Sequence, residues 1–394
     1  MYILVCNVGS TSLKFKLYNM PSAEALAEGK IERVGSRDDA VFHYKNCQSG
    51  FSVTLDKQCI PTYTEGIEKY LSYLTDKETG ALEDLKVLER IGFKTVLAKG
   101  YYGVHLLNEP VMAAMREYLP IAPVHNACYL EAIGQFQKIL PDKQLIGVFE
   151  TAFHVTIPKE RRLYAIPYEW YEKYGIQRLG YHGASHGYIA ERIGSIYGPA
   201  QKIISCHLGG SCSICAILDG QSIDNSFGFT PQTGVMHADR VGDADSYIVP
   251  FLMTQGMPME EILAGLDKKG GLKGVSGVSN DIRYLREAAD KGDERSKLAI
   301  AMLVDAIVRY IGSYYAFLGG LDHIVFTGGI GENDSRLRAD VCEKIPHLGV
   351  ALDGEINRTG EAERLVSSEG SLVKVHVIPA NEELVVARET YKYN

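Results

Sequence analysis

The sequence has no excess of basic residues and nothing that marks a secreted protein. Its 394 residues include 41 Lys and Arg against 49 Asp and Glu, which gives a net charge of −8. This balance argues against a protein that coats nucleic acid, because such a protein needs a basic surface. The chain starts MYILVCNVGSTS, without a basic region followed by a long apolar run, so we expect no signal peptide.

Long apolar runs free of charge are also missing. The most apolar segment, Leu298–Leu318, contains Asp305 and Arg309, and this favours a buried helix over a membrane span. The chain has 8 cysteines, several of them in strand-like runs, which indicates reduced core residues. We therefore expect a cytoplasmic protein without membrane contacts.

Several common catalytic and metal-binding patterns are absent. The chain has neither GxxxxGK[ST] nor GxGxxG, which disfavours P-loop NTPases and ordinary Rossmann dehydrogenases, and it lacks the HRD and DFG motifs of protein kinases. Cys212 and Cys215 fall in a predicted strand, where residues three apart face opposite sides, so a zinc or redox pair is disfavoured. His182 and His186 have no obvious third ligand, which argues against a metal site there.

Strand-like and helix-like segments alternate along the chain, a pattern typical of an α/β protein. Tyr2–Cys6 predicts a strand, Gly9 a turn, and the alternating residues Leu13–Leu17 a second strand that completes a hairpin. The helices predicted from apolar periodicity are Glu65–Leu74, Val111–Tyr118, Tyr188–Tyr197, Met259–Leu266 and Glu294–Leu318.

The sequence around the first turn is weakly repeated about two hundred residues later. Cys6–Thr11 and Cys206–Ser211 each follow an apolar strand and lead into an alternating one, which suggests two related halves. A third glycine-rich turn, Thr327–Asn333, follows the apolar run Ile324–Phe326. Glycine lets backbone N–H groups approach phosphate oxygens closely, so these turns are either a phosphate site or plain turns.

Motifs spread over nearly the whole chain resemble the acetate kinase family, within the actin-like superfamily of sugar kinases and chaperone ATPases. They are NVGSTSLK (Asn7–Lys14), APVHN (Ala122–Asn126), TAFH (Thr151–His154), YHGASH (Tyr181–His186), GFTP (Gly228–Pro231), RVGD (Arg240–Asp243), GVSG (Gly274–Gly277) with Asp281 and Arg283, FTGGIGEN (Phe326–Asn333) and NEEL (Asn381–Leu384).

The resemblance implies an α/β fold of two duplicated actin-like (RNase H-like) domains with an interdomain cleft. The first would cover residues 1–150 plus 385–394, and the second, nucleotide-binding domain residues 151–384. It also implies reversible phosphoryl transfer between ATP and a short carboxylic acid, giving ADP and an acyl phosphate, with Mg²⁺ or Mn²⁺. The partners would be a small carboxylate and an adenine nucleotide, with no nucleic acid and no membrane, in a homodimer.

The resemblance also assigns roles that make chemical sense, since phosphoryl transfer depends on positioning and electrostatic stabilisation. Glu150, His182 and Arg240 would be catalytic, and Asn7 and Glu382 would hold the metal ion. The substrate would be bound by Lys94, Val96, Val124, Tyr181 and Pro231. The nucleotide would be bound by Lys14, His207, Leu208, Gly209, Gly210, Ser211, Asp281, Ile282, Arg283, Gly329, Ile330, Gly331, Glu332 and Asn333.

Departures from the family pattern fall at positions that matter. Lys94 stands where the family has an arginine, and lysine is a point charge rather than a planar fork. Glu150 replaces an aspartate, Tyr181 a phenylalanine, and Asp239 a threonine beside Arg240. The family's HLGNGAS reads HLGGSCS from residue 207 onward. These changes lead us to expect a substrate larger or more polar than acetate.

Less specific interpretations remain open. Glu382 could simply favour a helix N-terminus, Lys94 could be a solvated lysine, and His125, His154 and His207 could be structural. A related phosphotransferase with another acceptor or donor, or a nucleotide-binding protein with little turnover, is the alternative function. The presence of Asn7, Lys14, His182, Arg240 and Glu382 disfavours an inactive protein.

Overall fold

The computed structural model describes the backbone of residues 1–394 and the side chains of all residues except 123–125. The chain forms two compact units, one of Met1–Ala152 with Asn381–Asn394 and one of Phe153–Ala380. The final helix begins at Glu382 and packs on the first sheet, which is why residues 381–384 belong with the first unit. The sequence had placed this return at residue 385.

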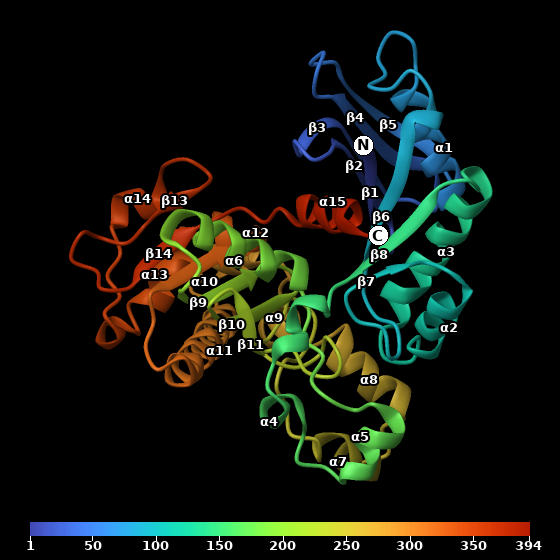
Figure 1. The fold of residues 1–394 in the computed structure, drawn as a ribbon. Coiled ribbons are helices and arrows are strands. Elements are labelled where there is room, and N and C mark those ends of the chain that lie inside the picture. The colour runs from blue at the N-terminus through green and yellow to red at the C-terminus, as the bar shows by residue number, and fades with distance from the viewer. The chain divides into compact units, whose positions relative to one another are not determined.

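The first unit is built on an eight-stranded sheet with the order β5-β4-β3-β2-β1-β6-β8-β7 (Figure 1). Its strands are β1 (Tyr2–Gly9), β2 (Ser12–Asn19), β3 (Glu24–Glu32), β4 (Ser36–Asn46), β5 (Ser52–Ile60), β6 (Leu88–Thr95), β7 (Val104–Leu106) and β8 (Gln144–Phe149). Its helices are α1 (Tyr63–Leu74), α2 (Glu109–Glu117), α3 (Pro123–Ile139) and α15 (Glu382–Lys392), with a 3₁₀ turn at Leu85–Val87.

Alternation along β1 assigns its residues to two faces of this sheet. Leu4 and Cys6 belong to the main core under α1 and α3, whereas Ile3 and Val5 pack with Val386 of α15. The parallel strands β1, β6 and β8 therefore lie between α3 on one face and α15 on the other.

The second unit contains a six-stranded sheet with the order β11-β10-β9-β12-β14-β13. Its strands are β9 (Lys202–Leu208), β10 (Cys212–Leu218), β11 (Gln221–Asn225), β12 (His323–Thr327), β13 (Arg364–Leu365) and β14 (Lys374–Val377). Its helices are α4 (Lys159–Arg162), α5 (Tyr168–Tyr174), α6 (Gly183–Tyr197), α7 (Ile248–Thr254), α8 (Met259–Asp267), α9 (Gly271–Ser276), α10 (Ile282–Asp290), α11 (Glu294–Leu318), α12 (Gly328–Asn333), α13 (Ser335–Cys342) and α14 (Gly354–Arg358). Two 3₁₀ turns lie at Ala152–Thr156 and Pro346–Leu348.

The two predicted strand–turn–strand units are both present. Cys6 pairs with Phe15 across the β1–β2 hairpin, and Cys206 pairs with Ile214 across the β9–β10 hairpin. Cys212 and Cys215 face opposite sides of β10, as expected, because they belong to different core clusters. All eight cysteines are free thiols.

Two local predictions need correction. The third glycine-rich segment is not an open turn, because Gly328–Asn333 forms the short helix α12 directly after β12. Helix α6 begins at Gly183 rather than near Tyr188, since the small residues of its first turn carry no apolar periodicity.

Helix α11 has the predicted bounds Glu294–Leu318, and by length and composition it is the one candidate membrane span among the described residues. Its buried side chains, such as Leu303 and Ile307, belong to the core of the second unit beneath β9 and β10. The helix is therefore used as a core helix, as its charged residues predicted.

Candidate active site

In the first unit, candidate residues meet at the carboxyl ends of three neighbouring parallel strands. Asn7 lies near the end of β1, Lys94 near the end of β6, and Glu150 directly after β8. Glu382 occupies the first turn of α15, on the face of the sheet that this helix covers. Ligands of α/β sheets commonly bind at such strand ends.

Lys94 joins the two acidic candidates. Its Nζ lies 2.7 Å from Oε2 of Glu382 and 3.1 Å from Oε1 of Glu150. The exposed fractions of the three side chains are only 17%, 15% and 5%. Burial opposes the charge of the ammonium, but the carboxylates of Glu150 and Glu382 outweigh it and hold the pKa of Lys94 well above its usual value. Lys94 is therefore a charged, buried group and not a solvated lysine.

Asn7 is positioned by a residue that the sequence analysis missed. The hydroxyl of Tyr129, on α3, donates to Oδ1 of Asn7 and accepts from the backbone N–H of Val8, both at 3.1 Å. Tyr129 is fully buried, and it lies one helical turn after Asn126 of the APVHN motif. That spacing on one helix face was the only signal in the sequence that could have found it.

Lys14 lies beside Asn7 in the β1–β2 register, and its side chain is exposed. It borders a groove of about 300 Å³ on the sheet surface, lined also by Lys16, Lys30 and Lys45. Lys16 and Lys30 are paired with acidic neighbours, at Glu28 and Glu32. Lys14 thus presents an ammonium on the same sheet face as Asn7.

The predicted apolar wall of the substrate site is divided between the two units. Val96 packs half-buried against the core of the first unit, and the side chain of Val124 lies outside the described residues. Tyr181 and Pro231 belong to the second unit. The hydroxyl of buried Tyr181 donates to the carbonyl of Phe229 at 2.8 Å, so it has found the partner that a buried hydroxyl needs.

His182 precedes helix α6 in a left-handed backbone conformation, with φ at +56°. Such a conformation costs free energy for a residue other than glycine and is common at functional sites. Its Nδ1 lies 2.8 Å from Oγ of Ser213, and its ring centroid lies 4.0 Å from that of His207. The strained backbone conformation of His182 therefore sets the direction of its imidazole ring.

Ser213 links His182 to a buried histidine network. Its Oγ also lies 2.8 Å from Nε2 of His186, whose Nδ1 reaches Ser205 at 2.9 Å. Burial, then the neighbouring imidazoles, lowers the pKa of His186 well below 6.5. The Ser213 hydroxyl has only one proton, so it can donate a hydrogen bond to only one of the two histidines. The other histidine must donate its own ring N–H to Ser213. The two ring nitrogens of the buried His186 both contact serine hydroxyls of the core, which fits a structural residue. His207, predicted to bind the nucleotide, has its Nδ1 2.8 Å from Oγ of Ser185.

Arg240 holds two loops of the second unit together. Its guanidinium donates to the carbonyl of Pro231 at 2.7 Å and to Oγ of Ser211 at 2.6 Å. Burial lowers the pKa of this side chain from its usual value. Asp239 directs its Oδ2 to the side-chain amide of Asn280, at 3.3 Å. The arginine thus joins the RVGD, GFTP and β9–β10 segments.

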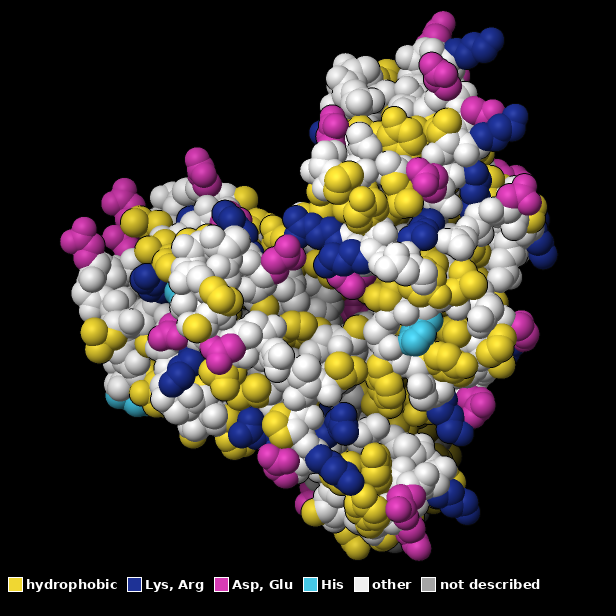
Figure 2. Space-filling view, in the orientation of Figure 1, with side chains coloured by type: hydrophobic (Ala, Val, Ile, Leu, Met, Phe, Trp, Pro, Cys, Tyr) yellow, Lys and Arg dark blue, Asp and Glu magenta, His cyan; other side chains and the backbone are white. Residues whose placement is uncertain are grey.

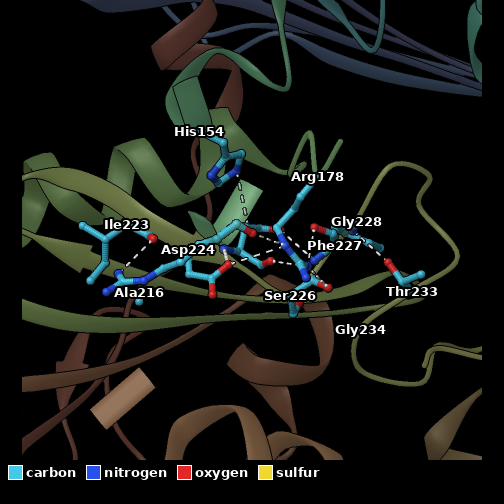
Figure 3. Close-up of polar contacts among 12 residues, drawn as sticks. His154, Arg178, Ala216, Ile223, Asp224, Ser226, Phe227, Gly228, Thr233 and Gly234 are labelled. Carbon is cyan, nitrogen blue, oxygen red and sulfur yellow. Dashed lines mark hydrogen bonds and ion pairs between the residues drawn. The ribbon is translucent and has the colours of Figure 1, made fainter. Parts of the chain in front are cut away.

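Arg178 supports the segment that leads to Pro231 (Figure 3). Its guanidinium donates to the carbonyls of Asn225 at 3.0 Å and Phe227 at 3.2 Å, and lies 3.7 Å from the carboxylate of Asp224. In the same view the N–H of Gly228 donates to Oγ1 of Thr233 at 2.7 Å. Sequence reasoning missed Arg178, which lies just before the YHGASH motif, because nothing in the local sequence indicates a partner 47 residues away.

The predicted nucleotide residues of the β9–β10 turn and of α12 lie at one end of the second sheet. Strands β9 and β12 are parallel neighbours, with His207 paired to Thr327, so Gly209–Ser211 and helix α12 follow adjacent strand ends. Gly328 has φ at +77°, and a Cβ there would lie 2.8 Å from the carbonyl oxygen of Leu208. The backbones therefore approach closely only because this residue is glycine.

Some of these residues have structural duties. Oε1 of Glu332 accepts from the backbone N–H groups of Gly328 at 2.9 Å and Ala380 at 3.0 Å. Asp281 caps α10 and pairs with the exposed Arg283 at 2.5 Å. The side chains of Leu208 and Ile282 lie in the core, which leaves only their backbones to a ligand. The other predicted contacts are Gly210, Gly329, Ile330, Gly331 and Asn333, all on the β9–β10 turn or α12.

Known proteins resemble this chain over its whole length. Residues 2–388 match the model of the acetokinase family. An acetate kinase of Bacteroides fragilis is 42% identical over 99% of this chain and 98% of its own. One of Dictyoglomus turgidum is 40% identical over 100% of this chain and 97% of its own.

Solved structures agree. The crystal structure of Porphyromonas gingivalis acetate kinase matches with a TM-score of 0.87 and 36% identity, covering 99% of this chain and 98% of that one. A propionate kinase from Francisella tularensis matches with a TM-score of 0.91 and 33% identity, covering both chains completely. These matches confirm the predicted α/β fold with the actin-like duplication. The chain therefore belongs to the acetokinase family.

Proposed function

We propose that this protein is an ATP- and Mg²⁺-dependent kinase that reversibly converts a short carboxylate to an acyl phosphate. The match of residues 2–388 to the acetokinase family carries the proposal. As a member of this family, the chain is a phosphotransferase with a carboxyl group as acceptor.

Within this proposal, Arg240 and His182 donate to the oxygens of the phosphoryl group in transit. Charge spreads over those oxygens in the transition state, where preorganised donors are most effective. The hydrogen bonds of Arg240 to Pro231 and Ser211, and of His182 to Ser213, support this role because they hold both groups in place before substrate arrives.

The nucleotide would be bound by the backbone of the β9–β10 turn and of α12, with Lys14 neutralising phosphate charge. The close backbone approach at Gly328 and the exposed position of Lys14 support this. Asp281 and Arg283, at the start of α10, would complete the nucleotide site.

The residues of the first unit fit a magnesium or manganese ion. Asn7 and Glu382 would hold the ion through hard oxygen donors. The ion pairs of Lys94 with Glu382 and Glu150 support this, because the two carboxylates favour a cation there. Mg²⁺ is usually bound through one or two carboxylates and keeps several of its waters, so it does not need a complete cage of protein ligands. When bound, Mg²⁺ would neutralise phosphate charge. Glu150 would orient the attacking carboxylate or a water, since a carboxylate substrate needs no general base.

The substrate would be bound by Lys94, Val96, Val124, Tyr181 and Pro231, and we propose that it is larger or more polar than acetate. Lys94 in place of the family's arginine supports this, whereas the Tyr181 hydroxyl is already used by Phe229. The test is a panel of carboxylates with ATP and Mg²⁺. We expect the highest kcat/KM for an acid that is longer than propionate or more polar than acetate, and a maximum at acetate or propionate would refute this choice.

Lys94→Arg sharpens that test. If Lys94 selects the substrate, the variant gains acetate activity and loses activity toward the preferred acid. Lys99→Arg, at an exposed lysine paired with Glu117 at 2.8 Å, is the control and should leave both activities unchanged.

We further propose a cytoplasmic homodimer. Large apolar side chains lie exposed on and around α5 and α7, including Tyr247 at 79% and Phe251 at 62%. Figure 2 shows hydrophobic side chains among charged ones over this part of the second unit. Exposed apolar groups of this size support an interface. Sedimentation of the wild type and of Phe251→Glu tests it, with dissociation expected in the variant.

A further inference from the structure

Lys94 and a metal ion would need the same carboxylate. The ammonium lies 2.7 Å from Oε2 of Glu382, the side chain proposed to hold the metal. It also lies 3.1 Å from Glu150. A dication bound at Glu382 would therefore meet a positive charge already in contact with its ligand.

The charges of Lys94, Glu150 and Glu382 favour movement of the ammonium when a dication binds. Two carboxylates and one ammonium leave a net charge of −1 in a largely buried setting, where ion pairs are screened little by solvent. Adding a dication without moving Lys94 would place like charges in contact, which is strongly unfavourable at low effective dielectric. The lysine stem is flexible, so the ammonium can move, whereas a rigid arginine fork could hold both carboxylates at once.

We propose that Lys94 is an exchangeable counter-cation: without a divalent ion its ammonium neutralises Glu150 and Glu382, and an arriving ion takes Glu382 and frees the ammonium to bind the anionic substrate. The inference rests on the proposed function for the identity of the metal and the substrate. It makes Lys94 a substrate-binding residue whose partner depends on the metal. Metal binding and binding of the substrate anion then favour each other, since each relieves a charge that the other opposes.

Two measurements on the full-length protein without nucleotide test this exchange. The first is the affinity for Mn²⁺, measured from the EPR signal of the free ion. Lys94→Met should bind Mn²⁺ about tenfold more tightly than the wild type or more, because the competing charge is gone. Lys99→Met, which removes a surface lysine of the same unit, should bind Mn²⁺ like the wild type.

The second measurement needs no variant, so it stands even if Lys94→Met fails to fold. Reductive methylation of the wild type, followed by peptide mass spectrometry, reports how accessible each lysine amine is. We expect Mg²⁺ to raise the labelling of Lys94 severalfold and to leave that of Lys99 unchanged. An equal Mn²⁺ affinity of wild type and Lys94→Met, or Lys94 labelling that ignores Mg²⁺, overturns the exchange.

These outcomes are separate from the test of the proposed function. An active carboxylate kinase whose Lys94 does not respond to Mg²⁺ refutes the exchange alone. A protein that transfers no phosphoryl group, yet binds Mn²⁺ more tightly as Lys94→Met, refutes the proposed function alone.

Discussion

Asn7 and Tyr129 lie 122 residues apart in the chain, yet one hydrogen bond of 3.1 Å fixes the amide of the first by the hydroxyl of the second. The same hydroxyl accepts from the N–H of Val8, so it satisfies two polar groups at the end of β1. At the scale of single residues, the candidate site depends on such supporting side chains as much as on the motif residues.

Tyr129→Phe should lower both stability and activity. The buried N–H of Val8 loses its acceptor, which costs about 1–3 kcal/mol of unfolding free energy, and Asn7 loses the bond that orients it. Urea unfolding and steady-state kinetics measure the two effects. Tyr70→Phe is the control, because among the described residues the buried Tyr70 hydroxyl has no hydrogen-bond partner. Equal effects of the two substitutions would contradict the role of Tyr129.

The buried His154 predicts a loss of stability in acid. Burial lowers the pKa of His154 from 6.5 to about 4, and its ring nitrogens lie 2.9 Å from Oγ of Ser222 and from the carbonyl of Tyr181. Since the unfolded chain binds the proton more readily, stability present above pH 6.5 falls as pH drops toward 4. Between pH 7.5 and 5.0 the wild type should lose about 2 kcal/mol more unfolding free energy than His154→Asn. Urea unfolding of both proteins at the two pH values measures this difference. An equal loss of unfolding free energy in the wild type and in His154→Asn would contradict the prediction.

The sequence predicted candidate site residues, but it did not predict the contacts between them. Lys94 and Glu382 belong to motifs that were recognised, but their ion pair joins positions 288 apart, and no local pattern encodes such a pairing. The interpretation of His154 as a structural residue is supported by its burial and its two polar contacts.

At the scale of elements, helix α15 positions Glu382 by packing closely on β6. Gly92 makes this possible, because a Cβ there would lie 2.3 Å from Oγ1 of Thr390 and 3.0 Å from Cγ1 of Val386. The helix therefore sits where its first turn meets Lys94 of the same strand.

Gly92→Ala should push α15 away from the sheet. Overpacking of this kind costs about 1–3 kcal/mol, and the displacement of Glu382 should reduce kcat as well. Gly134→Ala, in helix α3, is the matched control, because its new methyl group meets no atom within 4 Å and alanine favours a helix by up to about 1 kcal/mol. Thermal unfolding and activity of both variants test this, and a Gly92→Ala protein as stable and active as the wild type would contradict it.

The bounds of helices with strong apolar periodicity were predicted closely, whereas the structure of glycine-rich segments was not. Helix α11 has the predicted bounds because apolar residues recur on one face throughout. Helix α12 was expected to be a turn, since Gly-Gly-Ile-Gly has low helix propensity, and its contacts with β9 override that preference.

At the scale of the whole molecule, the two units repeat a strand–turn–strand hairpin, and each carries part of the candidate residues. Asn7, Lys14, Lys94, Glu150 and Glu382 belong to the first, whereas His182, Arg240 and the predicted nucleotide residues other than Lys14 belong to the second. The weak repeat in the sequence predicted the repetition, because hairpin geometry is encoded locally. The family resemblance placed the return of the chain to the first unit at residue 385, and in the structure the return is at Asn381. Nothing in the local sequence of α15 specifies its partner.

The most direct test of the proposed activity is a single-turnover reaction. The full-length protein, in excess over [γ-³²P]ATP, is mixed with Mg²⁺ and a carboxylate, and the labelled products are separated by chromatography. A labelled product that appears only with the carboxylate, and that hydroxylamine converts to inorganic phosphate, is the acyl phosphate. We expect the label to pass to the carboxylate in the wild type and to do so far more slowly in Arg240→Ala. A folded protein that binds ADP but transfers no label to any acid, from acetate to longer and more polar ones, would contradict the account.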